Sequence, residues 1–92
     1  MVGDLDKALD ALSAEGCKMG SGWEIAHEVA QANEGVAIFD QLHALCHRIE
    51  GDIANAHYWY RRAGVEMPSG DFDEELKNLM VESKKLNDNT RH

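Results

Sequence analysis

Histidine and carboxylate side chains stand at helical spacings in the middle of the chain, where they could bind a metal ion. His43 and His47 are four residues apart and Glu50 follows three residues later, so on a helix all three project from one side. Histidines and carboxylates at such spacings on facing helices build the metal sites of helical bundles. The sequence therefore predicts a divalent-metal site with these candidate ligands: His27, His43, His47 and either Glu50 or His57.

The alternative is that these histidines are structural. An imidazole at the margin of an apolar stripe usually lies half-buried, with one nitrogen bonded to a backbone carbonyl or a carboxylate. A two-metal site would also need a second Glu-x-x-His beside Glu24 and His27, and the chain has none. Both interpretations stay open, and they differ in whether the imidazoles converge.

Basic residues gather around the same stretch, in a chain whose net charge is −8. Arg48, Arg61 and Arg62 form a basic island that could hold a small phosphate or carboxylate ligand through bidentate contacts. The alternative is that Arg48 pairs with Glu50 and Asp52 to lock a helical corner, while the other arginines stay solvated.

Three consecutive aromatic residues mark a candidate contact surface. Tyr58, Trp59 and Tyr60 together cover most of the circumference of a helix. Trp59 and Tyr60 fit the apolar stripe, which turns Tyr58 outward beside Arg61 and Arg62. Tyrosine and arginine are enriched at protein interfaces, so we expect a protein partner or a second copy of the chain to bind here.

Other chemistries have little support in the sequence. No serine stands in a nucleophile elbow, and the segment Gly16–Gly20 lacks the Gly-Lys-Ser/Thr ending of a phosphate-binding loop. Cys17 and Cys46 form no CxxC pair, so neither a disulfide framework nor a local zinc motif is indicated.

Five segments must position these residues. Apolar side chains recur at intervals of three and four residues over 4–15, from Ser21 to about 33, over 36–50 and 53–63, and from Asp71 through Leu86. We expect Ser21 and Glu24 to form a capping box. Gly51 predicts a left-handed helix end followed by an Asp52 cap, and so a tight corner between antiparallel helices. The fold class predicted is all-α, a four- or five-helix antiparallel bundle of helical hairpins.

The length of the chain predicts one helical domain, residues 1–92. Within it we expect residues 1–20 to be loosely docked, 64–70 to link the last helix, and 88–92 to be a frayed tail. The excess of 17 acidic over 9 basic residues disfavours binding to nucleic acid or to an anionic membrane surface. No apolar run approaches the ~20 residues of a membrane span, so we expect a cytoplasmic protein.

The segment 51–64 resembles the second half of a Sel-type tetratricopeptide repeat. It has a Gly-Asp corner, then small residues, a Trp-Tyr pair and a basic residue followed by alanine. Only one such unit is present, whereas a solenoid needs about three, so the resemblance implies tetratricopeptide-like local packing and not an array. More widely, the chain is similar to a family of small all-helical proteins of unknown function that share the pattern HxxxHRxEGDxxNAxYWYRRA. This resemblance implies a fold and no activity.

We interpret the chain as a helical protein-interaction module without enzymatic activity, working with a protein partner or as a homodimer. The alternative is a metal- or anion-dependent enzyme that uses the margin of His27, His43, His47 and Glu50; apart from that metal, no cofactor is expected. The candidate binding residues are His27, His43, His47, Arg48, Glu50, Asn55, His57, Tyr58, Arg61 and Arg62.

Overall fold

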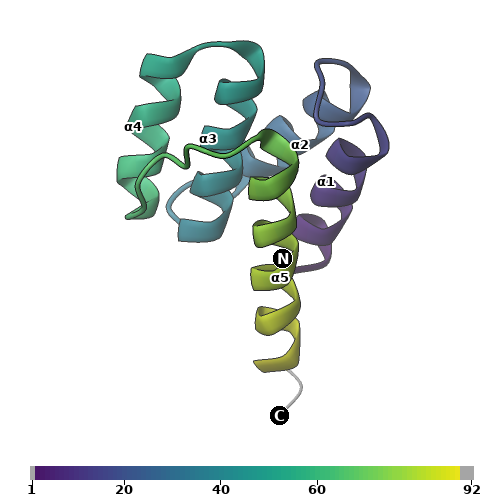
Figure 1. Ribbon diagram of the computed structural model, residues 1–92. Coiled ribbons are helices and arrows are strands. Elements are labelled where there is room, and N and C mark those ends of the chain that lie inside the picture. The colour runs from purple at the N-terminus through teal and green to yellow at the C-terminus, as the bar shows by residue number, and fades with distance from the viewer. Residues whose placement is uncertain (1, 90–92) are drawn as a thin grey trace.

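Five helices account for most of the chain in the computed structural model, which describes the backbone of residues 2–89 and the side chains of residues 3–86 (Figure 1). The helices are α1 (Val2–Ala14), α2 (Ser21–Ala32), α3 (Ala37–Glu50), α4 (Ile53–Ala63) and α5 (Phe72–Asn89). No strand occurs within residues 2–89, so the predicted all-α class is confirmed.

The third helix is the centre of the packing. α3 contacts α2, α4 and α5, while α1 packs against α2 and α5. Figure 1 shows α3 and α4 side by side as a hairpin, with α5 beside α1 and extending below the other helices. Because α3 has neighbours on several sides, it buries nearly its whole middle, from Phe39 to His47 apart from the half-buried Gln41. Any side chain on that helix is therefore held in a packed environment.

Two hydrophobic clusters stabilise this arrangement. The larger one joins α1, α2, α3 and α5 through buried leucines, alanines, Phe39 and both cysteines. The smaller one lies between α3 and α4 and contains Ala44, Ala56, Trp59 and Tyr60, covered by Met67. The two small alanines let the helices approach closely enough for the aromatic rings to fill the remaining gap.

A corner of two residues reverses the chain between α3 and α4, as predicted. Gly51 ends α3 with a left-handed φ of 89°, a conformation that favours glycine. The N–H of Asp52 donates to the carbonyl of His47 at 2.9 Å, and the Asp52 carboxylate accepts from the N–H of Asn55 at 3.3 Å. The corner therefore fixes the first turn of α4 against the last turn of α3.

The capping box predicted at Ser21 and Glu24 is wrong. The Glu15 carboxylate caps α2 instead, accepting from the Ser21 hydroxyl at 2.7 Å and from the Gly22 N–H at 3.1 Å. A carboxylate at a helix N-terminus accepts hydrogen bonds from unpaired amides and interacts favourably with the helix dipole. Glu15 therefore takes the capping role that was predicted for Glu24. This contact also ties the end of α1 to the start of α2.

A buried carboxylate holds α5 in place. Glu75 is 2% exposed and accepts from the Arg48 guanidinium at 2.7 Å and from the Tyr60 hydroxyl at 2.6 Å. Arg48 also donates to the carbonyl of Gly70 at 2.9 Å, so the segment predicted as a linker is anchored to α3. The corner pairing of Arg48 with Glu50 and Asp52 is therefore wrong, because Arg48 faces α5.

The first and last helices pack against the rest of the fold and against each other. α1 contributes Leu5, Leu9 and Leu12 to the core, and Ser83 of α5 donates a hydrogen bond to Asp6. The loose docking predicted for residues 1–20 concerns motion and stays a prediction. The predicted tail, 88–92, overlaps the end of α5, and its residues 90–92 lie outside the described residues. Among the described helices, none is both long and apolar enough to cross a membrane.

Candidate metal centre

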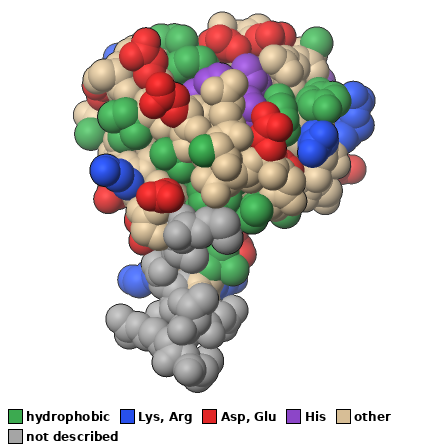
Figure 2. Space-filling model, turned by 180° about the vertical axis from the view of Figure 1, so that it is seen from behind, with side chains coloured by type: hydrophobic (Ala, Val, Ile, Leu, Met, Phe, Trp, Pro, Cys, Tyr) green, Lys and Arg blue, Asp and Glu red, His purple; other side chains and the backbone are tan. Residues whose placement is uncertain are grey.

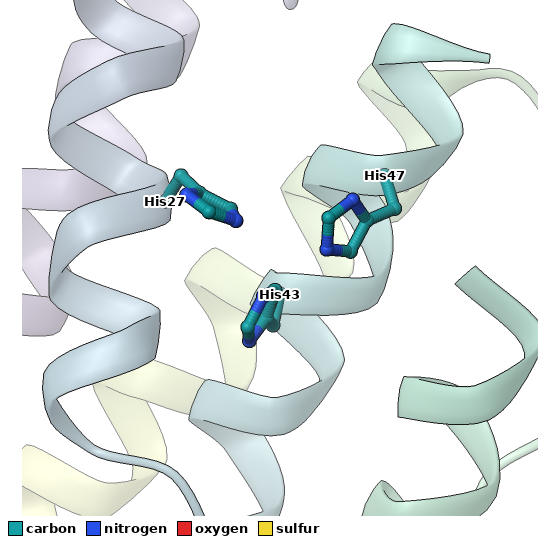
Figure 3. A group of neighbouring side chains, drawn as sticks. All are labelled: His27, His43 and His47. Carbon is teal, nitrogen blue, oxygen red and sulfur yellow. The ribbon is translucent and has the colours of Figure 1, made fainter. Parts of the chain in front are cut away.

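Three of the five histidines converge at one place between α2 and α3 (Figure 3). His27 comes from the middle of α2, while His43 and His47 come from successive turns of α3. The His27 ring reaches across the gap between the two helices toward the other two imidazoles (Figure 3). We call these three residues the histidine cluster.

The rings of the histidine cluster are in mutual contact. His43 and His47 lie with ring centroids 4.8 Å apart and planes inclined by 27°. The His27 ring stands edge-on to both, with centroids at 4.8 Å from His43 and 5.2 Å from His47. Offset-stacked and edge-to-face arrangements of this kind are the favourable geometries for aromatic rings.

Two tryptophans stack on different histidines of the cluster. Trp23 stacks on His27 with centroids 4.7 Å apart, and its indole N–H donates to the carbonyl of Cys46 at 2.7 Å. Trp59 stacks on His43 at 4.0 Å, from the side of α4. The indoles therefore fix the orientation of His27 and His43, so the imidazoles are positioned before any ligand arrives.

Two ring nitrogens of the cluster are buried without a hydrogen-bond partner among the described residues. They are Nε2 of His27 and Nδ1 of His43. A buried polar atom without a partner costs about 1–3 kcal/mol, and each such atom in a folded protein needs an explanation. Because two of them lie on facing helices, next to a third imidazole, this place is the candidate site for a ligand that binds nitrogen.

The electrostatics favour neutral imidazoles at the cluster. Burial, together with the neighbouring His27 and His47, lowers the pKa of His43 from 6.5 to about 4. Burial, followed by repulsion from His47, also lowers the pKa of His27, and Glu50 and Glu28 offset part of this effect. Both residues are therefore neutral at pH 7 and present a lone pair, which is the form that binds metal.

His47 has partners on both ring nitrogens. Its Nδ1 lies 2.5 Å from a Glu50 carboxylate oxygen, and its Nε2 lies 3.3 Å from the side-chain nitrogen of Asn55. A carboxylate on one nitrogen of a histidine is the usual support of a metal ligand, since it fixes the tautomer and the orientation of the ring. Glu50, a predicted candidate ligand, thus lies behind His47.

The spacing of the cluster suits one transition-metal ion. Each histidine offers a nitrogen, and the three nitrogens lie within 4.8 Å of one another. Zinc binds imidazole at about 2.0–2.1 Å in tetrahedral geometry, which places ligand nitrogens ~3.3 Å apart, so small side-chain rotations would gather them. Figure 2 shows histidine side chains on one face of the molecule, between acidic and apolar groups.

A second set of donors lies beside the histidine cluster. His47, Glu50 and Asp52 also offer ligand atoms within 4.8 Å of one another. Both carboxylates already serve other groups, because Glu50 contacts the His47 ring and Asp52 caps α4. Both carboxylates are exposed, and their negative charge attracts cations to this part of the surface.

The remaining predicted site residues do not join the cluster. His57 is exposed on α4, in a shallow hollow with Arg61 and Val65. Arg48 is occupied by Glu75, so it is not free to hold an anionic ligand. Tyr58, Arg61 and Arg62 lie on the exposed side of α4, as predicted for Tyr58 from the aromatic pattern.

Sequence reasoning missed three residues that shape this region. No role at the site was predicted for Trp23 or Trp59, although each stacks on a cluster histidine. No role was predicted for Glu75, although this carboxylate is buried and accepts from Arg48 and Tyr60. Its position gave a signal: it stands three residues after Phe72 and four before Leu79, and therefore within the apolar stripe. A charged residue in a stripe requires a buried partner.

Comparison with known proteins gives no relative for this chain: no family model matches it, and no curated protein or solved structure is significantly similar to it.

Proposed function

We propose that this protein binds one divalent transition metal, of the zinc class, through His27, His43 and His47. The observation that carries the proposal is the pair of buried, unpartnered nitrogens on α2 and α3, adjacent to a third imidazole that is supported by a carboxylate. Imidazole ligands suit zinc, copper and nickel, whereas magnesium and calcium prefer oxygen.

Three protein ligands leave one coordination position for water. Sites of this composition polarise bound water and perform hydrolytic chemistry in enzymes, while closed sites of four ligands are structural. An open three-histidine site is therefore also compatible with the metal-dependent enzyme that the sequence offered as the alternative. Both cysteines are free and buried thiols, which suits a reducing compartment, and we place the protein in the cytoplasm.

Isothermal titration calorimetry with Zn²⁺ tests the proposal. We expect one ion per chain with a Kd below about 10 µM. Single substitutions His27→Gln, His43→Gln and His47→Gln each remove a ligand and weaken binding by at least about 10-fold. The matched control is His57→Gln, because His57 is exposed and outside the cluster. Equal loss in the control, or no binding by the wild type, contradicts a site at the histidine cluster.

The exposed side of α4 supports a second candidate function, a protein-interaction module. Tyr58 is 45% exposed, and the Arg62 guanidinium lies 5.9 Å from its ring centre and donates to its hydroxyl at 3.3 Å. Arg61 is exposed beside them, so an aromatic and basic surface stands out on an acidic molecule. The resemblance of 51–64 to a Sel-type tetratricopeptide hairpin also supports this function.

Sedimentation velocity at micromolar concentration tests whether the partner is a second copy. We expect a dimer that Tyr58→Ala weakens, because a central tyrosine carries a large share of the energy of an interface. Lys77→Ala, an exposed substitution on α5, serves as the control. A wild-type protein that sediments as a monomer at every concentration contradicts the homodimer.

A further inference from the structure

His47 is the one cluster histidine whose two ring nitrogens both have partners among the described residues, and those partners come from different elements. Glu50 lies on α3, one turn after His47, and contacts Nδ1 at 2.5 Å. Asn55 lies in the first turn of α4 and places its side-chain nitrogen 3.3 Å from Nε2. The two contacts impose one proton arrangement. A carboxylate accepts a proton from Nδ1, and an amide nitrogen donates a proton to Nε2.

The lone pair of His47 is therefore on Nε2, and Asn55 already uses it. A metal ion bound by the three histidines needs a lone pair from His47. Nδ1 cannot supply it while it donates to Glu50, so Nε2 is the ligand atom. Metal and amide compete for the same electron pair, and the amide must leave when the metal binds.

We propose that Asn55 is a latch that limits the metal affinity of the site, and that Glu50 is a positioning residue that keeps His47 in the ligating tautomer. This inference rests on the proposed metal-binding function. It assigns opposite effects to two neighbours of one ring: the latch weakens metal binding, and the positioning carboxylate strengthens it.

The corner between α3 and α4 places the latch. His47 and Asn55 are eight residues apart, too far to meet on one helix, and they meet because the chain reverses at Gly51. The backbone N–H of Asn55 is held by the Asp52 carboxylate at 3.3 Å, and the N–H of Asp52 by the His47 carbonyl at 2.9 Å. The amide is thus delivered to the ring by the same turn that joins the two helices.

The expected effects follow from the strength of each contact. A neutral hydrogen bond contributes little net free energy because water replaces it, so releasing the latch should tighten binding roughly 2- to 10-fold. Loss of a carboxylate behind a metal-ligating histidine typically weakens binding about 10- to 100-fold. The two variants therefore move the Kd in opposite directions.

The test compares Zn²⁺ affinity by calorimetry in the full chain and in two variants, Asn55→Ala and Glu50→Gln. Asn55→Ala keeps the backbone N–H that Asp52 caps, so the corner remains intact. Glu50→Gln keeps an acceptor oxygen near Nδ1 and removes only the charge. The controls are Asn78→Ala and Glu82→Gln, which change the same residue types at exposed positions of α5. We expect tighter binding for Asn55→Ala, weaker binding for Glu50→Gln, and wild-type affinity for both controls.

A second readout separates positioning from general stability. The ¹⁵N shifts of the imidazoles in the metal-free protein report which nitrogen of His47 carries the proton. We expect protonated Nδ1 in the wild type and in Asn55→Ala, and a mixture of tautomers in Glu50→Gln. A destabilised but otherwise unchanged site would leave the tautomer as it is.

The outcomes distinguish this inference from the function on which it rests. A wild type that binds no Zn²⁺ overturns both. A wild type that binds, with Asn55→Ala equal to it or weaker, overturns the latch and leaves the metal site standing. Binding by Glu50→Gln at wild-type affinity, or an unchanged His47 tautomer in that variant, overturns the positioning role.

Discussion

At the scale of single residues, two groups of buried polar side chains, one around Glu75 and one in the histidine cluster, have opposite character. Around Glu75 every charged group has a partner: Arg48 and Tyr60 both donate to the carboxylate. Burial and the neighbouring Glu75 raise the pKa of the Tyr60 phenol, so that it remains a donor. In the histidine cluster two nitrogens lack partners among the described residues. The first group stabilises the fold, and the second is the candidate metal site.

Removing the charge of Glu75 tests how much its buried ion pair contributes to the stability of the fold. Glu75→Gln leaves the Arg48 guanidinium without a carboxylate in a buried site, which typically costs about 3–5 kcal/mol of unfolding free energy. The matched control is Glu82→Gln, because Glu82 pairs with Lys85 at 3.3 Å on the exposed side of α5. Loss of an exposed pair costs less than about 1 kcal/mol. Urea denaturation followed by circular dichroism measures the loss of unfolding free energy in both variants. Equal losses would show that the buried ion pair stabilises the fold no more than the exposed pair does.

The low pKa of His43 predicts how stability depends on pH. Burial, with the help of the two neighbouring histidines, lowers this pKa from 6.5 to about 4 in the folded chain. Between these values the unfolded chain binds a proton that the folded chain does not, so the free energy of unfolding falls as the pH falls from 6.5 to 4. At pH 4 the titration of His43 has lowered the free energy of unfolding by about 3 kcal/mol.

Chemical denaturation of the metal-free protein at several pH values measures this dependence. We expect His43→Gln to flatten the slope between pH 4 and 6.5, and His57→Gln, the exposed control, to keep it. An unchanged slope in His43→Gln would mean that other groups account for the acid sensitivity.

At the scale of helices, the sequence predicts the elements well because each depends on local signals. The spacing of apolar residues predicts four or five helices, and the helix predicted at 53–63 coincides with α4. The Gly51–Asp52 corner forms as expected because a left-handed glycine and an aspartate cap act within a few residues. The cap of α2 was predicted wrongly because Glu15 lies on the preceding helix, and a contact between helices leaves no local pattern.

The convergence of the histidines illustrates the same limit. The turn spacing of His43 and His47 is local, so their shared side of α3 could be predicted from the sequence. The approach of His27 depends on how α2 crosses α3, and the role of Asn55 depends on the reversal at Gly51. Trp23 is set by its bond to the backbone of α3, twenty-three residues away. These contacts follow from tertiary packing, which residue spacing does not determine.

The contact between α1 and α2 depends on one glycine. A Cβ atom at Gly22 would collide with the backbone carbonyl oxygen of Ala11, so Gly22→Ala must push the two helices apart. We expect a loss of about 1–3 kcal/mol, as for an overpacked core. Gly3→Ala is the control, because a Cβ there meets nothing within 4 Å and alanine favours the helix. Thermal unfolding of both variants tests this, and a stabilised Gly22→Ala would contradict the close packing.

At the scale of the whole molecule, a bound metal would join α2 to the hairpin of α3 and α4. Ligand binding to the folded state alone adds about 2.7 kcal/mol to the stability when the free ion is at 100 times its Kd. For a domain of this size each kcal/mol raises Tm by roughly 4–8 °C, so saturating Zn²⁺ should raise Tm by at least about 10 °C. Differential scanning calorimetry measures the shift, and excess chelator should reverse it.

The control for this experiment is a variant that lacks one histidine of the cluster. His27→Gln removes the only ligand that α2 contributes, so we expect the Zn²⁺-dependent shift in Tm to disappear while the metal-free Tm changes little. An equal shift in this variant would place the stabilising ion elsewhere on the acidic surface.

The stacking of the two tryptophans on the cluster has a practical consequence. Trp23 and Trp59, the only tryptophans of the chain, each lie face to face with a different histidine. The emission of an indole in such contact changes when its neighbouring imidazole gains a proton or a quenching ion such as Cu²⁺. The protein therefore carries an intrinsic fluorescent reporter at each side of the site. Replacing one indole at a time by phenylalanine would reveal whether the signal arises beside His27 or beside His43.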